Sequence, residues 1–126
     1  MKSVVRIQRV ESVVIAALVV SVFLALGYAW WWLPVLFVAF DISAIGYLRG
    51  TRVGAVFYNI GHSYAVPGVI AGIAAILAAL GQASEPLGVI AGAWIFHIAI
   101  DRAFGFGLKQ PDSFGHTHLG AVGRRT

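Results

Sequence analysis

The sequence predicts an all-α fold, a bundle of four transmembrane helices, from its composition, its apolar runs and its basic residues. Hydrophobic residues make up 60% of the 126-residue chain and charged residues only 11%. In soluble domains about 45–50% of the residues are apolar and about 25% are charged. A soluble domain of this length buries too little surface to hide so many apolar side chains. We therefore expect one integral membrane domain covering residues 1–126.

Four apolar runs provide the predicted spans, at residues 10–27, 33–48, 53–80 and 87–104. Each is long enough, or nearly so, to cross a hydrocarbon core of about 30 Å. The third run exceeds the length of one span and contains Pro67, which predicts one long helix kinked at Pro67. The alternative is an interfacial turn that precedes the true span. Residues 105–126 are too rich in glycine and polar residues for a fifth span and form a predicted cytoplasmic tail.

The basic residues predict the orientation of the bundle. With four spans, all nine fall on one side of the membrane: Lys2, Arg6, Arg9, Arg49, Arg52, Arg102, Lys109, Arg124 and Arg125. Basic residues gather on the cytoplasmic side of membrane proteins, so both termini are expected to be cytoplasmic in a multi-pass protein of the inner (cytoplasmic) membrane. This also accounts for the net charge of +4. The expected partners are membrane lipid, further copies of the chain or a larger membrane complex, and not nucleic acid.

Ionisable residues lie inside these apolar runs. His97 and Asp101 are four residues apart in the fourth span, so they share one helix face. Asp41 lies in the second span and His62 in the third. At 1.5 Å per residue, Asp41, His62 and His97 lie roughly 8–15 Å below the inner surface. Such groups are costly there unless they face protein, water or a ligand, which predicts a shared polar pocket open to the cytoplasm.

Imidazole nitrogens and carboxylate oxygens are ligands that suit zinc, iron or manganese. A histidine held by a carboxylate is also a competent general base. The predicted metal ligands are His62, His97, Asp101 and two tail histidines, His116 and His118. His97, Asp101 and Asp41 are predicted to act in catalysis, with Tyr58, Asn59 and Arg102 around them. The chain has no cysteine, which excludes thiolate chemistry and disulfides.

Several functional hypotheses stay open on the sequence alone. The favoured one is a metal-dependent enzyme acting on a lipid or another amphiphile. The alternatives are a non-catalytic membrane subunit and a small-ligand or haem-binding module with His62 and His97 as axial ligands. Simpler roles exist for single residues: Asp101 can pair with Arg102 at the interface, and tail histidines are often solvated.

A resemblance to a known family rests on residues from the second span to the tail. These are Asp41, Gly46-Tyr47-Leu48, Tyr58-Asn59, His62, His97, Asp101-Arg102, Gly105, Gly107-Leu108-Lys109, Phe114 and Thr117-His118-Leu119-Gly120. Together they resemble domain-of-unknown-function family 4260, small bacterial multi-span membrane proteins. Phe106 departs conservatively from the tyrosine expected there. The resemblance implies a four-helix membrane protein and brings no established activity.

Overall fold

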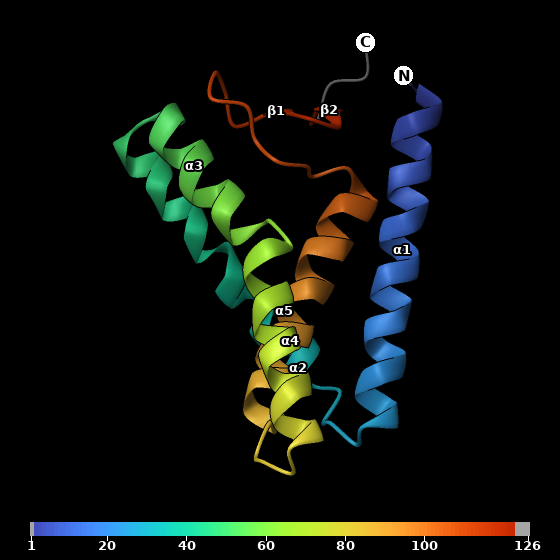
Figure 1. The fold of residues 1–126 in the computed structure, drawn as a ribbon. Helices are drawn as coiled ribbons and strands as arrows, with labels where there is room; N and C mark the ends of the chain where they lie inside the picture. The colour runs from blue at the N-terminus through green and yellow to red at the C-terminus, as the bar shows by residue number, and fades with distance from the viewer. Residues whose placement is uncertain (1, 123–126) are drawn as a thin grey trace.

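The computed structural model describes residues 2–122 and confirms the all-α prediction (Figure 1). Four helical segments are long and apolar enough to cross a membrane, namely Lys2–Ala25, Trp32–Arg49, Thr51–Ala79 and Glu85–Phe104. The chain is thus a multi-pass membrane protein. The elements are, in order, α1 (Lys2–Ala25), α2 (Trp32–Phe37), the 3₁₀ helix η1 (Val38–Arg49), α3 (Thr51–Gly61), α4 (Ala65–Ala79), α5 (Glu85–Phe104), β1 (His116–Thr117) and β2 (Gly120–Ala121).

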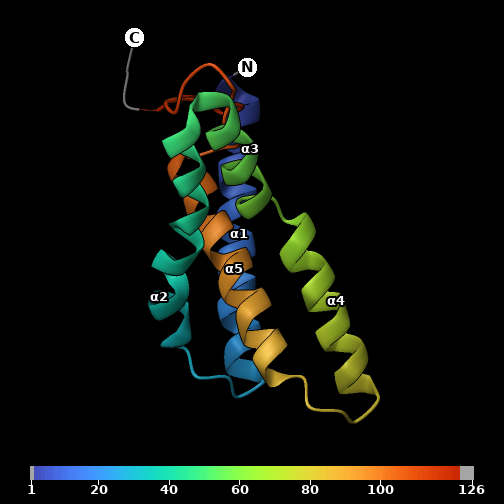
Figure 2. The ribbon, with the colours of Figure 1, turned by 90° about the vertical axis from the view of Figure 1, so that its left-hand side faces the viewer.

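Helix α5 is the centre of the bundle and packs against α1, α2 and α4. Helix α3 packs instead against η1, and this pair leans away from α1 at the end of the molecule that holds the β-hairpin (Figures 1 and 2). At the opposite end, Phe23, Leu33, Val89 and Ala93 form the apolar core. The apolar core therefore lies at one end of the bundle, and α3 and η1 diverge from α1 at the other.

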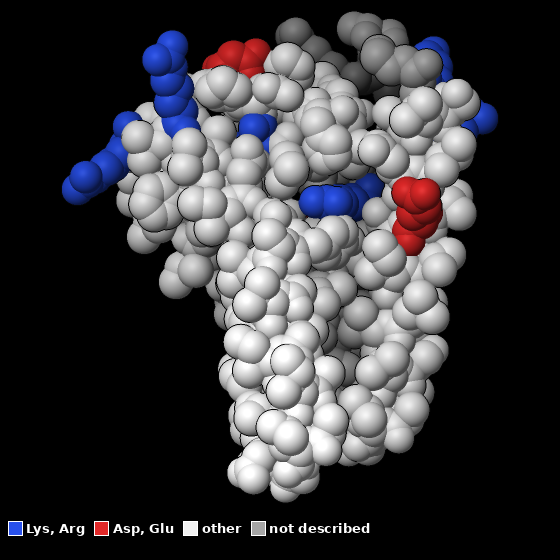
Figure 3. Space-filling view, in the orientation of Figure 1, with Lys and Arg blue, Asp and Glu red and all other residues white. Residues whose placement is uncertain are grey.

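Charged side chains mark the two ends differently. On the face drawn in Figure 3, Lys, Arg, Asp and Glu gather on the upper half, and the lower half shows none. The start of α1 and the β-hairpin both lie at the charged end (Figure 1). This agrees with the clustering of basic residues that the sequence predicts, although Arg124 and Arg125 lie outside the described residues. The cytoplasmic location of this end stays a prediction.

The second span changes helix type along its length. It begins as α-helix at Trp32 and continues as a 3₁₀ helix from Val38 to Arg49. Runs of 3₁₀ helix longer than three or four residues are uncommon because the hydrogen-bond geometry is poorer. Side chains three residues apart eclipse one another in this helix, so Val38 and Asp41 point to the same side. This register places Asp41 toward the site described below.

The third span is broken, but not where the sequence predicted. Helix α3 ends at Gly61 and α4 begins at Ala65, with His62–Tyr64 between them. The predicted kink at Pro67 is wrong, because Pro67 lies in the first turn of α4. The first four N–H groups of a helix have no partner within it, so a proline in the first turn removes no hydrogen bond. His62 therefore lies directly after the last residue of α3, outside the regular helix.

Residues 105–122 fold back across the charged end. Gly105 ends α5 in the left-handed conformation (φ 97°), and its N–H bonds the carbonyl oxygens of Asp101 and Arg102. Strands β1 and β2 pair antiparallel, and Lys109 forms a bridge to Thr117. The tail is therefore ordered over the opening of the bundle.

Candidate metal centre

Four side chains from three helical segments meet at the open end of the bundle: Asp41, His62, His97 and Asp101. We call them the His/Asp cluster. Asp41 comes from the first turn of η1, His62 follows the last residue of α3, and His97 and Asp101 lie one helical turn apart on α5. The structure thus brings together the residues that the sequence placed at one depth in three spans.

The donor atoms of the cluster lie very close to one another. The two Nε2 atoms of His62 and His97 are 3.0 Å apart. The Nε2 atom of His62 lies 3.3 Å from Asp101 Oδ2 and 3.6 Å from Asp41 Oδ1. The Nε2 atom of His97 lies 3.4 Å from Asp41 Oδ1 and 3.6 Å from Asp101 Oδ2. All four ligand atoms lie within 4.8 Å of one another.

These separations are those of atoms around one ion. Ligands at about 2.0–2.1 Å from a tetrahedral zinc are about 3.3–3.4 Å from each other. The five separations above, 3.0–3.6 Å, surround that value. They also fit four positions of an octahedral manganese or iron site, whose neighbouring ligands are about 3.0 Å apart. The cluster can therefore hold a divalent metal with little movement.

His62 is held in the tautomer that a metal requires. Its Nδ1 lies 3.0 Å from the Tyr58 carbonyl oxygen and 3.3 Å from Ser43 Oγ. A carbonyl oxygen only accepts, so Nδ1 carries the proton of the neutral ring and donates it. The lone pair of Nε2 is then free to face the cluster. Histidine ligands are usually oriented in this way by a backbone carbonyl or carboxylate.

A glycine allows the approach that brings Ser43 to His62. A Cβ atom added at Gly61 would lie 2.6 Å from the Cβ and Oγ atoms of Ser43. Real Cβ atoms do not approach so closely, so η1 and α3 can pack at this distance only because residue 61 is glycine. Ser43 was not identifiable from the sequence, because an isolated serine in an apolar run gives no signal of this role.

His97 is the deepest member of the cluster. It is fully buried, and its ring lies 4.4 Å from that of Phe37 and 5.8 Å from that of Phe40. Among the described residues its Nδ1 has no hydrogen-bond partner. His97 therefore enters the cluster from its buried, aromatic side. Two imidazole nitrogens and two carboxylate oxygens this close repel one another unless a cation or protons lie among them.

The two carboxylates differ in exposure. Asp101 is 17% exposed and its Oδ2 accepts a long hydrogen bond of 3.4 Å from the Tyr58 hydroxyl. Asp41 is 53% exposed. Asp41 is therefore the exposed member of an otherwise largely buried cluster, and a further group can reach the donor atoms beside it.

The predicted neighbours of the site have separate contacts. The Tyr58 ring stacks on the His62 ring, with centroids 3.7 Å apart. Arg102 donates from Nη2 to the His62 carbonyl oxygen at 3.3 Å and does not pair with Asp101 within 4 Å. Asn59 bonds both backbone groups of Lys109, with Nδ2 donating to its carbonyl oxygen at 2.9 Å and Oδ1 accepting from its N–H at 2.6 Å. Asn59 thus attaches the tail to α3.

The two tail histidines do not join the cluster. His116 Nδ1 lies 2.7 Å from Asp112 Oδ2, an exposed contact that lowers the pKa of the Asp112 carboxyl. His118 Nδ1 accepts the N–H of Leu108 at 2.8 Å. Burial, aided by the nearby Arg102 charge, lowers the pKa of His118. Both side chains stabilise the fold of the tail, because their ring nitrogens are engaged within it.

Lys109 is the residue through which the tail approaches the site. It is 3% exposed, and its Nζ lies 3.9 Å from the centre of the Phe114 ring, 4.9 Å from that of Tyr58 and 5.9 Å from that of Phe106. Burial lowers the pKa of its ammonium group, and the Asp101 charge opposes this. The aromatic residues around it were a signal for this cation–π contact, which the sequence analysis missed.

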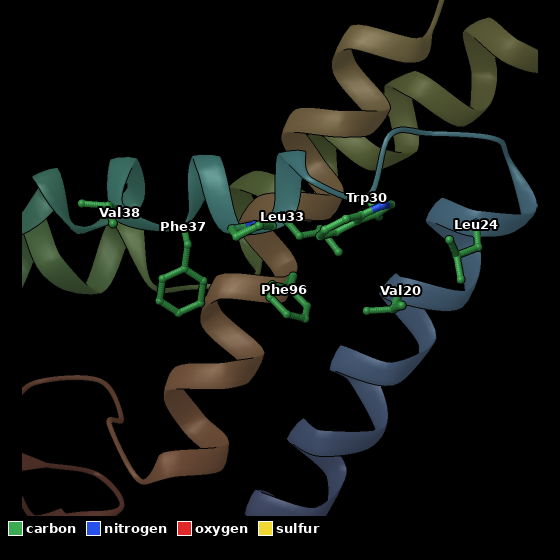
Figure 4. A pocket seen from close by; sticks show the side chains of 8 residues that line it. Val20, Leu24, Trp30, Leu33, Phe37, Val38 and Phe96 are labelled. Carbon is green, nitrogen blue, oxygen red and sulfur yellow. The ribbon is translucent and has the colours of Figure 1, made fainter.

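An apolar pocket of about 580 Å³ lies between α1, the second span and α5. Figure 4 shows Val20 and Leu24 of α1 facing the side chains of α2 and α5, including Phe37 and Phe96. The Phe37 ring separates this pocket from His97. Val38 also lines the pocket and shares a side of η1 with Asp41. The pocket therefore shares Phe37 and Val38 with the surroundings of the cluster and contains none of its four side chains.

Comparison with known proteins gives a family and no activity. The model of the family DUF4260, described as a domain of unknown function, matches residues 5–122. The chain therefore belongs to this family, as its motifs predicted. No curated protein and no solved structure matches it.

Proposed function

We propose that this member of the DUF4260 family is a metal-dependent membrane hydrolase that acts on a lipid or another amphiphile. The observation that carries the proposal is the convergence of four donor atoms from three helical segments, with five of their six separations at 3.0–3.6 Å and all of them within 4.8 Å. Two neutral imidazoles and two carboxylates give the cluster a charge of −2, which a divalent cation balances. Zinc, manganese and iron all accept such a ligand set.

The exposure of the ligands divides their roles. His62 and His97 are buried and fixed, so they hold the ion. Asp101 is oriented by Tyr58 and does the same. Asp41, on the open side, is placed to accept a proton from water or substrate as well as to bind the metal. A divalent ion in such a site polarises a carbonyl or phosphoryl oxygen and activates water near neutral pH.

The pocket beside the cluster indicates the class of substrate. Its lining is entirely apolar, from Val20 on α1 to Phe96 on α5. A substrate with an alkyl chain in this pocket would place its polar end near Asp41, because Val38 and Asp41 share one side of η1. Ligand sites commonly combine such an apolar lining with a few polar groups. A water-soluble substrate would gain nothing from this lining.

A second candidate function is an ion site that stabilises the bundle without catalysis. Four protein ligands complete a tetrahedral zinc site, and closed sites of this kind are structural. A haem module does not fit the geometry. Axial nitrogens on opposite faces of a porphyrin need a separation of about 4 Å, twice a metal–nitrogen bond of about 2.0 Å, whereas the two Nε2 atoms are 3.0 Å apart with carboxylates beside them.

The test uses the full chain, purified in detergent and reconstituted into vesicles. We expect one divalent metal per chain by mass spectrometry of the elements, and metal-dependent cleavage of an ester- or phosphoester-linked amphiphile. Asp41→Asn should retain most of the metal, because three ligands remain, and lose most of the cleavage. A metal-loaded protein that cleaves none of these amphiphiles, and whose Asp41→Asn variant is merely less heat-stable, would establish the structural site instead. Metal-free protein would refute both functions.

A further inference from the structure

A second polar pocket, of about 180 Å³, lies outside the His/Asp cluster. Its lining comes from α1, from Tyr64 between α3 and α4, from Arg102 on α5 and from His118 in the tail. It includes none of the four cluster side chains. A water molecule takes about 30 Å³ in the liquid, so the pocket has room for a polar group of several heavy atoms.

One side of this pocket carries hydrogen-bond donors. Arg102 stacks over the Tyr64 ring at 4.4 Å and uses one nitrogen on the His62 carbonyl oxygen, which leaves other guanidinium N–H groups. The Tyr64 hydroxyl is buried and has no partner among the described residues. His118 accepts at Nδ1 from Leu108, so the neutral ring carries its proton on Nε2. These donors suit an anionic group such as a phosphate.

The other side of the pocket carries a carboxylate, that of Glu11 on α1. Within the described residues Glu11 forms no ion pair with Arg102 closer than 4 Å. The pocket thus presents the held guanidinium of Arg102 and the exposed carboxylate of Glu11 to whatever enters it. A group with one negative and one positive charge complements both.

An apolar groove of about 760 Å³ begins where the polar pocket ends, and Ile15 lines both. The groove runs between α1 and α4, with Gly88 and Gly92 of α5 at its floor. Its lining extends along α1 from Ile15 to Leu26, just past the end of the helix, about 16 Å at 1.5 Å per residue. That is close to half of a hydrocarbon core of about 30 Å, the depth of one lipid leaflet. The hollow between the two helices is visible in Figure 3, with blue and red side chains near its upper end.

We propose that this pocket and groove bind one phospholipid with a zwitterionic phosphoethanolamine head group. Its phosphate accepts from Arg102, Tyr64 and His118, its ammonium group faces Glu11, and one acyl chain lies in the groove from Ile15 onward. A head group with a net negative charge would be repelled by the Glu11 carboxylate. Free phosphate would leave the groove unused. The proposal does not depend on the metal centre or on its activity.

The experiment measures which lipids stay with the full chain. The protein is reconstituted in nanodiscs containing equal amounts of phosphatidylethanolamine, phosphatidylcholine and phosphatidylglycerol, and retained lipid is identified by native mass spectrometry after release in detergent. We expect one phosphatidylethanolamine per chain. Equal or greater retention of phosphatidylglycerol or phosphatidylcholine would overturn the proposal, as would displacement of the lipid by millimolar inorganic phosphate.

Three variants test the assigned contacts. Glu11→Gln should lower the preference for phosphatidylethanolamine about fivefold, the scale of a partly exposed ion pair, whereas Glu85→Gln at the far end of the groove should leave it unchanged. Ile15→Trp should expel all three lipids by filling the junction. Tyr64→Phe should weaken retention while it keeps the ring on which Arg102 stacks. A preference for phosphatidylethanolamine that survives Glu11→Gln would refute the assignment.

Metal content measured in the same samples keeps the two proposals apart. Glu11→Gln and Ile15→Trp touch no cluster residue, so the metal content should equal that of the unmodified chain. Loss of lipid with metal retained supports the lipid site alone. Retention of all three lipids in equal amounts by metal-loaded protein refutes the lipid site and leaves the proposed function standing.

Discussion

The chain contains two pairs of histidines, and the structure uses them in opposite ways. His116 and His118 form a His-x-His sequence that looks like a metal motif, yet each ring bonds within the tail. His62 and His97 are 35 residues apart, and their Nε2 atoms meet at 3.0 Å with two carboxylates. Local spacing alone was therefore a weak guide to a site. Burial at a common depth, on separate spans, was the stronger one.

The physical reason is the solvent around each pair. A polar side chain in the tail can be satisfied by water, so its sequence neighbours say little about its partners. An imidazole between apolar spans has no water available and must find protein or a ligand. Intramembrane polar residues are therefore forced together, whereas tail residues are not.

The largest expected effect is a difference in metal affinity between variants of the two pairs of histidines. His62→Ala and His97→Ala should each weaken metal binding by more than about 100-fold, because even residues that only orient metal ligands typically contribute about 10–100-fold. His116→Ala should change the affinity less than about twofold. Competition with a chromogenic chelator measures all three. Equal losses for His97→Ala and His116→Ala would show that the pairs do not differ.

A second prediction compares the two carboxylates of the cluster. Asp101→Asn should weaken metal binding more than Asp41→Asn, since Asp101 is 17% and Asp41 53% exposed and solvent screens the exposed charge. We expect about tenfold between the two variants, which is about 1.4 kcal/mol. The same chelator competition measures it. A larger loss of metal affinity in Asp41→Asn than in Asp101→Asn would mean that Asp41, not Asp101, is the more shielded ligand.

A third prediction concerns the attachment of the tail. Asn59→Ala removes both hydrogen bonds to the Lys109 backbone. Leaving such groups unpaired costs about 1–3 kcal/mol, so cleavage within residues 105–122 by a protease should become about 10-fold faster or more. Gln110→Ala, an exposed change in the same segment, is the matched control. Unchanged cleavage in Asn59→Ala would mean that the tail is held elsewhere.

The smallest expected effect is a pH dependence in the tail. Because burial lowers the pKa of His118, the folded tail binds a proton more weakly than the unfolded chain. The contribution of His118 to stability is therefore complete above the unfolded pKa of about 6.5 and declines as the pH falls below it. Hydrogen-exchange protection of the Leu108 amide should decrease between pH 7.5 and pH 5.5. His118→Asn, which keeps an acceptor and does not titrate, should flatten this dependence.

The number and order of the spans were predictable because they depend on apolar length alone. Val10, Leu33 and Leu87 begin runs that no soluble fold could bury, and the structure has membrane-length helices over each. The break at His62–Tyr64 was not predictable from Pro67, since a proline is as compatible with a first turn as with a kink. The change to 3₁₀ helix at Val38 also has no local signal. Both features depend on how η1 packs against α3.

The site was predictable in part for the same reason. Asp41, His62, His97 and Asp101 were identifiable as ionisable residues at one depth, and that sufficed to bring them together. Ser43 was not identifiable, because it acts through a contact with the distant His62 ring, and Lys109 had only the nearby aromatic residues Phe106 and Phe114 as a signal. Lys109 in particular resembles an ordinary interfacial lysine until Tyr58 and Phe114 are seen around it.

Tyr58 touches His62 with its ring, Asp101 with its hydroxyl and the Lys109 ammonium group with its π face. If the His/Asp cluster binds an ion as proposed, this one side chain would couple ion binding to the docking of the carboxyl-terminal segment. Thermodynamic linkage makes such coupling reciprocal: an ion that orders Tyr58 slows detachment of this segment, and a docked segment raises ion affinity by the same factor. A partner that pulls on the residues beyond Lys109 would thereby shorten the residence time of the ion.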